Sequence, residues 1–593
     1  MKPILGLILL SSVVTSSIAL TPEQSLKVVY PPAIHQTTAQ KIFFIGTAPS
    51  NGQVFINGKP INRSKSGHFA PSLPLQLGEN LFTIRYQNQE VQIKVTRNSN
   101  QPNLPQGLAF ANDSLFPKAD IARLPGELIC FSAIATPNAS VSVKLGNQII
   151  PLSPEQQMAE LPANSAALTG QNQPSAQSST GKYAGCTTIS TAGDLGQPQY
   201  QLTLNGKTIT QPGTGKVQIL SPTALEVVEV TADSGVARTG PSTDHSRLTP
   251  LPYRTRAAVT GKEGEWLRLD YGAWINSKET RVLLGAIPPR TIIRSVGYRQ
   301  RPNVTEMVFP LQVPVPVSVQ QGDRTFTLTL HNTTAQTDII RLDDDPLISR
   351  LDWQQLPPTP SGEVGGVQYT FNLKPNQQWG YKLRYDGTSL ILALRHPPAL
   401  ARIKKQKPLS GVKILLDPGH GGKESGALGP TGYPEKDVNL AVSKLVRDEL
   451  VKRGATVVMT REDDRDVSLV DRVAMINKEE PAIAMSIHYN SLPDEGNAEN
   501  TKGIGAFWYN TQAHSLAVFL HNYIVSKRGR PSYGVFWNNL ALTRPAAAPS
   551  VLMELGFMSN PNEFEWVTDS KEQKKLATTI ADGLVEWFRK VHS

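Results

Sequence analysis

Residues 414–422 read Ile-Leu-Leu-Asp-Pro-Gly-His-Gly-Gly, a short apolar run that ends in a polar, glycine-rich turn. An apolar run of this length is typical of a strand that is covered on both faces of a sheet. The glycines around His420 permit a tight turn that projects its imidazole. In open α/β sheets, functional sites collect beyond the carboxyl ends of the strands. This stretch therefore predicts an α/β domain with a functional side chain, His420, at the end of a strand.

The rest of the C-terminal third alternates between helix-like and strand-like segments. Apolar residues recur at helical spacing through residues 437–453 and again through 469–478. Short apolar runs at residues 455–459, 482–487 and 551–555 have the length of strands. This alternation predicts an α/β domain with a mostly parallel central sheet flanked by helices.

Upstream of residue 411 the chain has a different character. Short extended runs alternate with turn signals, such as Asn57-Gly58 between two apolar runs, which is a strong hairpin signal. The 593 residues include 46 Pro and 45 Gly, and only 18% are charged, which favours β-rich modules with many turns. We therefore predict a multidomain protein in which several small all-β modules precede the α/β domain.

One of these modules has a more particular pattern. Residues 235–238 read Gly-Val-Ala-Arg, residues 240–242 read Gly-Pro-Ser, and Trp266 and Trp274 follow in extended runs. This order resembles a bacterial SH3-like barrel, a module that commonly binds cell-wall peptides. The two tryptophans are equally consistent with core aromatics of a small barrel, so the pattern favours the fold more than it favours any ligand.

The complete organisation is predicted from these breaks in pattern. In chain order it is a signal peptide at 1–19, an immunoglobulin-like β-sandwich at 28–97, a second β-module at 120–222 with a low-complexity insertion at 153–183, the SH3-like barrel at 225–284, a β-domain at 287–396, a linker at 397–410 and the α/β domain at 411–593. The last strand-like run of the β-domain, at residues 389–394, resembles the end of the AMIN-type domains that are found upstream of wall amidases.

The N-terminal residues predict export. Lys2 precedes an apolar core at residues 4–10, and Ser17-Ile18-Ala19 supplies small residues before a cleavage point after Ala19. The apolar core is short for a membrane span, and no later stretch is long and apolar enough to cross a bilayer. We expect a mature protein of the periplasm or cell wall with no transmembrane segment.

Charge and cysteine content narrow the partners. The net charge of +10 favours an anionic partner, yet the chain has no dense Lys/Arg run and no nucleic-acid motif, so nucleic acid is not expected. Cys130 and Cys186 fall within one β-module, and an oxidising compartment would permit one disulfide between them. The sequence leaves open whether their geometry allows it.

Three further side chains belong to the same predicted sheet edge as His420. His488 ends the run at 482–487, Glu554 interrupts the apolar run at 551–555, and Glu435 directly precedes a helical segment. Burying a carboxylate inside an apolar strand costs free energy, so such a carboxylate is expected to be paired, protonated or functional. Two histidines and a carboxylate with an open position are a known ligand set for catalytic zinc. Their wide separation in sequence makes the spacing alone weak support.

The sequence around these side chains is more specific. Residues 414–422, 434–440, 486–491 and 551–560 resemble, in the same order, the motifs of the zinc-dependent N-acetylmuramoyl-L-alanine amidases of the third class. The resemblance covers about a third of the chain, from Gly411 onward. Thr460-Arg461, Ser468-Leu469 and Arg472 agree with it as well.

The resemblance implies a function and a division of roles. His420, Glu435 and His488 would hold Zn²⁺, and Glu554 would be the catalytic carboxylate that takes a proton from water and returns one to the leaving amine. The implied substrate is peptidoglycan, cut at the amide bond between N-acetylmuramic acid and the L-alanine of the stem peptide.

Two residues are weaker candidates for substrate binding. They are Asn490 and Arg544, and an ordinary surface ion pair is the alternative for Arg544. The chain also departs from the family at Glu424, where relatives carry Asp, although we expect no contact between Glu424 and a ligand residue. Some relatives insert a blocking helix after the second histidine motif. Residues 492–502 are too short for one, so we predict an open site, which occlusion by another segment of the chain would contradict.

Three alternative functions stay open. The first is a catalytically silent wall-binding protein, and the second is a zinc peptidase of the wall. The third is a glycosidase that uses Glu435 and Glu554 as paired acids, in which the two histidines have no role. The sequence does not identify the wall-binding module, any protein activator, the oligomeric state or the biological occasion.

Overall fold

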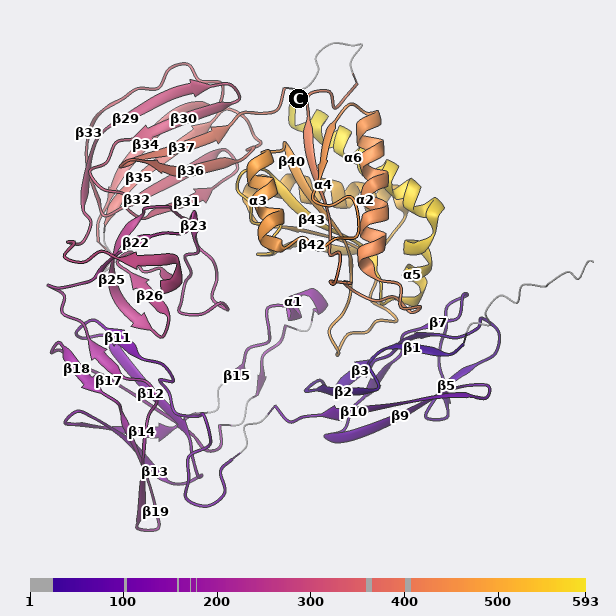
Figure 1. Ribbon diagram of the computed structural model, residues 1–593, viewed down its shortest axis with the longest axis horizontal. Helices are drawn as coiled ribbons and strands as arrows, with labels where there is room; N and C mark the ends of the chain where they lie inside the picture. Colours follow the sequence, from indigo (N-terminus) through magenta and orange to yellow (C-terminus); the bar gives the residue numbers. More distant parts are fainter. Residues whose placement is uncertain are drawn as a thin grey trace, which may run out of the picture.

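The computed structural model describes residues 25–100, 104–156, 159–170, 172–176, 179–358, 365–399 and 407–592. The predicted signal peptide lies outside the described residues, as do residues 400–406 of the predicted linker. The prediction of β-rich modules followed by a C-terminal α/β domain is confirmed (Figure 1). Among the helices of the described residues, none has the length and apolar character needed to cross a membrane.

The first module is built from short strands in three small sheets. The sheets are β1 (Lys27–Tyr30), β4 (Ile45–Thr47) and β7 (His68–Phe69); β2 (Ile34–Thr37), β10 (Gln89–Arg97), β9 (Gly78–Tyr86), β5 (Val54–Ile56) and β6 (Lys59–Pro60); and β3 (Lys41–Phe43) with β8 (Ser72–Pro74). Asn57 and Gly58 connect β5 to β6 with φ angles of 49° and 77°, the left-handed values that tight hairpin turns require. Alternate residues of β9, such as Phe82 and Ile84, fill the core.

The second module contains a six-stranded antiparallel sheet in the order β12-β17-β14-β13-β19-β20. Its strands are β12 (Leu128–Ile134), β13 (Ser140–Leu145), β14 (Gln148–Pro154), β17 (Lys182–Thr188), β19 (Gln199–Leu204) and β20 (Lys207–Pro212). Cys130 and Cys186 lie directly opposite each other on β12 and β17 and form a disulfide. The pairing that the sequence left open is therefore settled by strand register.

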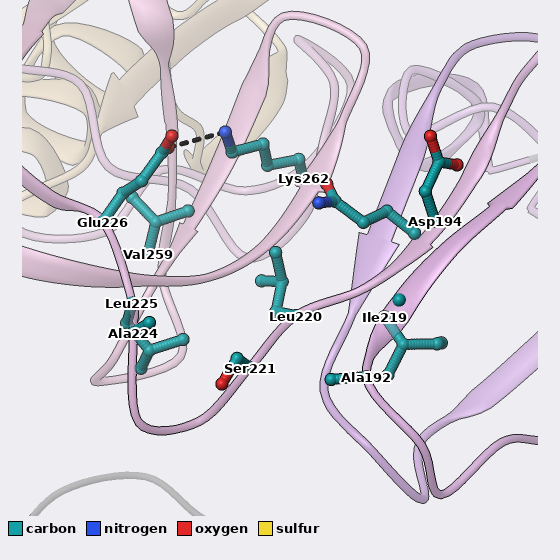
Figure 2. Close-up of a pocket in the computed structure, with 12 residues that line it drawn as sticks. Ala192, Asp194, Ile219, Leu220, Ser221, Ala224, Leu225, Glu226, Val259 and Lys262 are labelled. Carbon is teal, nitrogen blue, oxygen red and sulfur yellow. Dashed lines mark hydrogen bonds and ion pairs between the residues drawn. The ribbon is translucent and has the colours of Figure 1, made fainter.

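The second module shares a sheet with residues 225–284, the region predicted to be an SH3-like barrel and called the barrel below. β11 (Ile121–Arg123) pairs with β21 (Val217–Ile219) on one side and with β25 (Arg256–Glu263) of the barrel on the other. Figure 2 shows the hollow at this junction, bridged by an ion pair between Lys262 Nζ and Glu226 Oε2 at 2.6 Å. The remaining strands of this sheet are β18 (Gly193–Gly196), β22 (Val227–Val230) and β28 (Thr280–Val282), and the rest of the barrel comprises β23 (Ser234–Gly235), β24 (Leu251–Pro252), β26 (Trp266–Leu269), β27 (Trp274–Asn276) and a 3-10 turn at Ser277–Glu279.

The fourth β-region packs two sheets face to face. Their orders are β33-β29-β30-β37-β36 and β31-β32-β35-β34. The bounds are β29 (Thr291–Arg301), β30 (Val304–Phe309), β31 (Val317–Gln321), β32 (Thr325–His331), β33 (Thr333–Ile340), β34 (Ile348–Leu356), β35 (Gly366–Leu373), β36 (Tyr381–Asp386) and β37 (Ser389–Arg395). Its core is aromatic, with Phe309, Phe326, Tyr369 and Phe371 fully buried.

The α/β domain is a six-stranded sheet in the order β39-β38-β40-β43-β41-β42. Its elements are β38 (Lys413–Pro418), α2 (Glu435–Lys452), β39 (Thr456–Met459), α3 (Leu469–Glu479), β40 (Ile483–Asn490), β41 (Ile504–Trp508), α4 (Thr511–Arg528), β42 (Ser532–Trp537), β43 (Ser550–Phe557), α5 (Pro561–Thr568) and α6 (Ser570–His592). Ile414 and Leu416 face the core shared with α2, α4 and α6, whereas Leu415 packs in the smaller cluster that includes Ile476 of α3. This two-sided burial explains why the run at 414–416 is apolar throughout.

The sheet is not uniformly parallel. β39, β38, β40 and β43 run parallel to one another, but β41 is antiparallel to β43, and β42 follows the direction of β41. The start of β42 therefore lies at the same edge as the carboxyl end of β43. The segment that follows β42 begins at the opposite edge, which decides the location of Arg544.

Candidate metal centre

His420, Glu435 and His488 meet at the carboxyl ends of β38 and β40. Each offers one ligand atom, and these atoms lie within 4.8 Å of one another. Nε2 of His420 is 3.2 Å from Oε2 of Glu435, and Nδ1 of His488 is 3.0 Å from its Oε1. The carboxylate thus stands between two imidazole rings whose centroids are 4.9 Å apart.

Glu435 is held by main-chain and side-chain donors. It is the first residue of α2 and its side chain is only 5% exposed. Ala427 N donates to Oε2 at 2.9 Å, while Asn439 Nδ2 and Tyr489 N donate to Oε1 at 3.0 and 3.1 Å. A carboxylate at a helix N-terminus also interacts favourably with the helix dipole. The position of Glu435 is therefore fixed before any ligand arrives.

Glu435 and His420 shift each other's pKa through the hydrogen bond that joins them. Burial alone would raise the pKa of Glu435, but hydrogen bonds with His420 and His488 outweigh it and hold the pKa well below its usual range. Burial would lower the pKa of His420, and the hydrogen bond to Glu435 raises it instead.

Close packing requires glycine at two places in this site. A Cβ at Gly419 would lie 2.1 Å from Cε1 of His488, and a Cβ at Gly426 would lie 2.4 Å from Oε2 of Glu435. Gly426 also has a φ of 67°, which side chains rarely adopt. His420 itself has a φ of 59°, an unusual angle for a residue with a side chain.

A buried ion pair holds the His420 loop in that conformation. The side chains of Arg472 and Asp417 are 3% and 1% exposed, with Nη1 and Oδ1 2.6 Å apart. Thr460 Oγ1 and Ser486 Oγ also donate to the Asp417 carboxylate. The second guanidinium nitrogen of Arg472 donates to the carbonyl of His420 at 2.7 Å. Asp417 and Arg472 therefore position the imidazole through the backbone.

Glu554 lies beside this cluster on the neighbouring strand. It is opposite His488 in the register of β40 and β43. Its Oε2 atom is buried and has no hydrogen-bond partner among the described residues. Burial raises the pKa of Glu554 well above its usual value, and the negative charge of Glu435 adds to the effect. An orphaned buried carboxylate oxygen next to an N,O,N ligand set fits a site that holds a metal and its reactants.

Two further segments of the chain, β42 and the short helix α1 (Ala166–Thr169), lie near Glu554. Tyr533 of β42 packs against Phe557 with ring centroids 4.9 Å apart, and its pKa is raised by burial and then by the charge of Glu554. The Tyr533 hydroxyl donates to the carbonyl of Leu168, in α1. α1 belongs to the insertion of the second module, with β15 (Ala159–Glu160) and β16 (Ser175–Ala176), and reaches this edge of the α/β domain (Figure 1).

The expectation of an open site is therefore met only in part. Residues 492–502 contain no helix, and the side chain of His420 remains 28% exposed. The contact of Leu168 with Tyr533 nevertheless brings another segment of the chain to the site. The 492–502 loop is also docked, because Asp494 accepts from Tyr30 and lies 3.0 Å from His35 of the first module.

The other sequence candidates have different locations. Glu424 does reach a predicted ligand, contrary to expectation, since its Oε2 is 4.0 Å from Nδ1 of His420. Its longer side chain spans that gap. Asn490 is two residues beyond His488 on β40, and its Oδ1 accepts from Ser491 N at 2.8 Å. Arg544 follows β42 at the opposite edge of the sheet and donates to the carbonyl of Asn539.

Sequence reasoning missed two contributors. Asn439 is four residues after Glu435, a spacing that places two helical side chains on one face, so the helical pattern contained this signal. Tyr533 had none, because its approach to Glu554 depends on the reversed direction of β41 and β42.

Comparison with known proteins agrees with this geometry. Residues 414–586 match the family model described as N-acetylmuramoyl-L-alanine amidase. The chain is 36% identical over 187 residues to a protein of Staphylococcus aureus described as a probable cell wall amidase, LytH. That alignment covers 31% of this chain and 61% of the relative, so the chain spans less than two thirds of that relative's length.

Solved structures of similar sequence cover the same domain. An N-acetylmuramoyl-L-alanine amidase from Clostridium difficile 630 is 31% identical, with 30% of this chain and 97% of that chain covered and a TM-score of 0.29. The amidase AmiC2 of Nostoc punctiforme is 29% identical, with 31% and 99% covered and a TM-score of 0.29. The family model matches from residue 414 onward, so its match does not include the upstream β-rich modules.

Proposed function

We propose that the protein is an exported zinc-dependent N-acetylmuramoyl-L-alanine amidase that cleaves peptidoglycan between muramic acid and the L-alanine of the stem peptide. The observation that carries the proposal is the convergence of His420, Glu435 and His488 on one point, with the orphaned carboxylate oxygen of Glu554 beside them. The family match of residues 414–586 supports the same reaction.

The donor set fits zinc. Two imidazole nitrogens and one carboxylate oxygen are a common protein ligand set for a catalytic Zn²⁺ with an open position. When bound, the ion would polarise the scissile carbonyl and acidify a water molecule. Asn439 and the main-chain donors orient Glu435, and Arg472 orients His420 through its carbonyl, so the ligands are pre-positioned.

Glu554 has the environment that a proton carrier needs. A raised pKa makes its carboxylate a better proton acceptor than an exposed glutamate. We assign it the removal of a proton from the attacking water and the delivery of one to the departing amine. Asn490, on the same strand as His488, is the candidate for contact with the substrate near this edge.

The upstream modules would hold the enzyme on the wall. The net charge of +10 suits an anionic polymer, and residues 225–284 carry the SH3-like pattern. The predicted signal at residues 1–19 would deliver the protein to the periplasm or cell wall.

The deciding experiment is mass spectrometry of purified peptidoglycan after incubation with the mature protein, alongside Glu554→Ala and a chelated sample. We expect stem peptides with a free L-alanine amino terminus, absent from both controls. No release at all would favour a silent wall-binding protein or a missing activator. Products cut within the peptide would indicate a zinc peptidase, and release that survives chelation would remove zinc from the mechanism.

A further inference from the structure

Three arginines gather where the barrel meets the amidase domain, at the sheet edge opposite the metal centre. Arg238 and Arg247 are directly opposite each other in an antiparallel bridge of the barrel, so their side chains start about 5 Å apart. Arg544 comes from the amidase domain. We call Arg238, Arg247 and Arg544 the arginine cluster.

Hydrogen bonds connect the two domains at this point. The hydroxyl of Tyr509 donates to the carbonyl of Arg247 at 3.3 Å. The next residue, Asn510, donates through Nδ2 to the carbonyl of Arg544 at 2.8 Å. Arg247 and Arg544 are therefore joined through two consecutive residues of the amidase domain, which keeps both arginines at one interface.

The positive charge of the cluster is poorly compensated. Among the described residues, no carboxylate forms an ion pair with any of the three arginines. The negative charges of Glu279 and Asp244 act on Arg238 from a longer distance and raise its pKa, but burial and the charge of Arg247 outweigh them. Burial and then the charges of Arg247 and Arg238 lower the pKa of Arg544 to about 10. Like charges brought together at a partly buried interface are unfavourable unless an anion joins them.

The three arginines differ in their availability. Arg238 is only 7% exposed, and its Nη1 donates to the carbonyls of Thr243 and His245, so it supports the barrel loop. Its Nε is buried without a partner among the described residues. Arg247 and Arg544 are half-buried, and within the described part of the chain the Arg544 side chain donates hydrogen bonds only to Asn539. Both have donors left for a ligand.

An exposed aromatic surface adjoins the cluster. The rings of Tyr509 and Trp537 lie 5.1 Å apart, and Trp537 is 59% exposed although its Nε1 donates to Tyr509 O at 3.0 Å. An aromatic face beside guanidinium groups suits a ligand that has both a carboxylate and apolar or sugar-like surface.

We propose that the arginine cluster, with Tyr509 and Trp537, binds a free carboxylate of a peptidoglycan stem peptide, at a site separate from the metal centre. The choice of this ligand rests on the proposed function, because the amidase reaction presents such peptides. Arg247 and Arg544 hold the carboxylate and the aromatic pair packs against the peptide. The barrel and the amidase domain thus bind the stem peptide together, at the edge of the sheet opposite the metal centre.

The test uses the full-length protein carrying Glu554→Gln, so that binding is measured without cleavage. The probes are a synthetic stem peptide with a free carboxyl terminus and the same peptide as its C-terminal amide. The binding of each probe is measured by calorimetry. We expect the amide to bind at least about tenfold more weakly than the acid. The double variant Arg247→Gln/Arg544→Gln should remove that difference, while Arg254→Gln, an exposed arginine elsewhere on the barrel, should keep it.

Several results would overturn the proposal. Equal binding of acid and amide would exclude carboxylate recognition, and unchanged binding by the double variant would exclude this cluster. Binding of a phosphate polymer but not of the peptide would assign the cluster to a different anion. Release of stem peptides by the protein with Glu554 intact is scored separately, so failure of the amidase reaction is distinguishable from failure of this site.

Discussion

At one edge of the amidase sheet the buried charges are paired, whereas at the other edge they are not. Glu435 lies within 3.2 Å of two imidazole nitrogens and accepts hydrogen bonds from Ala427 N and Tyr489 N. At the opposite edge, Arg247 and Arg544 have no ion pair within the described part of the chain. At the first edge the protein's own side chains balance the buried carboxylate. At the second edge the arginines are arranged to bind the carboxylate of a ligand.

The same contrast appears in two buried aspartates. Asp417, beside the candidate metal centre, is paired with Arg472. Burial alone would raise the pKa of Asp417, but the charge of Arg472 and the hydrogen bonds to the carboxylate hold it below its usual value. Asp270 of the barrel accepts hydrogen bonds from Ala258 N and Asn332 Nδ2, and burial raises its pKa to about 6. Asp417 therefore has an ion-pair partner, whereas Asp270 has none among the described residues, and their pKa values move in opposite directions.

The largest expected effect is on catalysis at the first edge. Glu554→Gln keeps the shape of the side chain but cannot carry the proton, so the rate of stem-peptide release should fall about 10²- to 10⁴-fold. The rate is followed by mass spectrometry. Glu462→Gln, which removes an exposed carboxylate of the same domain, should retain the rate. A Glu554→Gln enzyme of normal activity would contradict the assigned role.

The second prediction concerns zinc binding at the edge that contains Glu435. Asn439→Ala removes a hydrogen bond to Glu435 and should weaken zinc binding about 10- to 100-fold, and His488→Ala should weaken it more. Both are read by elemental analysis and competition with a chelator. His514→Ala, at an exposed histidine, is the matched control. Equal zinc content in all variants would place the metal elsewhere.

Breaking the buried pair should lower stability more than any surface change. Arg472→Met leaves Asp417 buried without its cation, which should cost about 3–5 kcal/mol of unfolding free energy. Arg447→Met breaks exposed pairs with Asp448 and Glu462 and should cost less than about 1 kcal/mol. Chemical denaturation of each variant gives the comparison. Similar losses would mean that burial does not distinguish these pairs.

The barrel should respond to pH in the opposite direction from a paired aspartate. The folded-state pKa of Asp270 is raised, so its contribution is fully present below about pH 4 and is lost as the pH rises through about 6. Asp270→Asn should remove this part of the pH dependence between pH 4 and 7, a change of up to about 3 kcal/mol. Thermal unfolding at several pH values measures it. Parallel curves for both proteins would show that Asp270 does not titrate in this range.

The smallest effect concerns the second-module segment at the catalytic edge. Replacing residues 163–169 by a Gly-Ser linker of equal length removes α1 and its hydrogen bond with Tyr533. If that contact competes with substrate, turnover should rise about 2- to 10-fold, the range of one hydrogen bond. The rate on purified peptidoglycan is the measurement. An unchanged or lower rate would mean that α1 does not restrict access.

The local elements and the residues that meet at the candidate metal centre were largely predictable from the sequence. The apolar run at 414–416 predicted a strand, helical spacing predicted α2 and α3, and the four ordered motifs singled out His420, Glu435, His488 and Glu554. These features are local, because a strand or helix places its own neighbours by a fixed period. The residues that sit at the carboxyl ends of parallel strands then share one edge.

Other features depended on how strands pair across long separations. The sequence by itself determined which segments become strands and helices and which residue types stand at their ends. Only the tertiary structure decided that β41 and β42 run in reverse, which brings Tyr533 to Glu554 and carries Arg544 to the opposite edge. It also decided the register that joins Cys130 to Cys186 and the contact of Glu424 with His420. Strand direction and register are set by the packing of distant segments, and no local pattern encodes them.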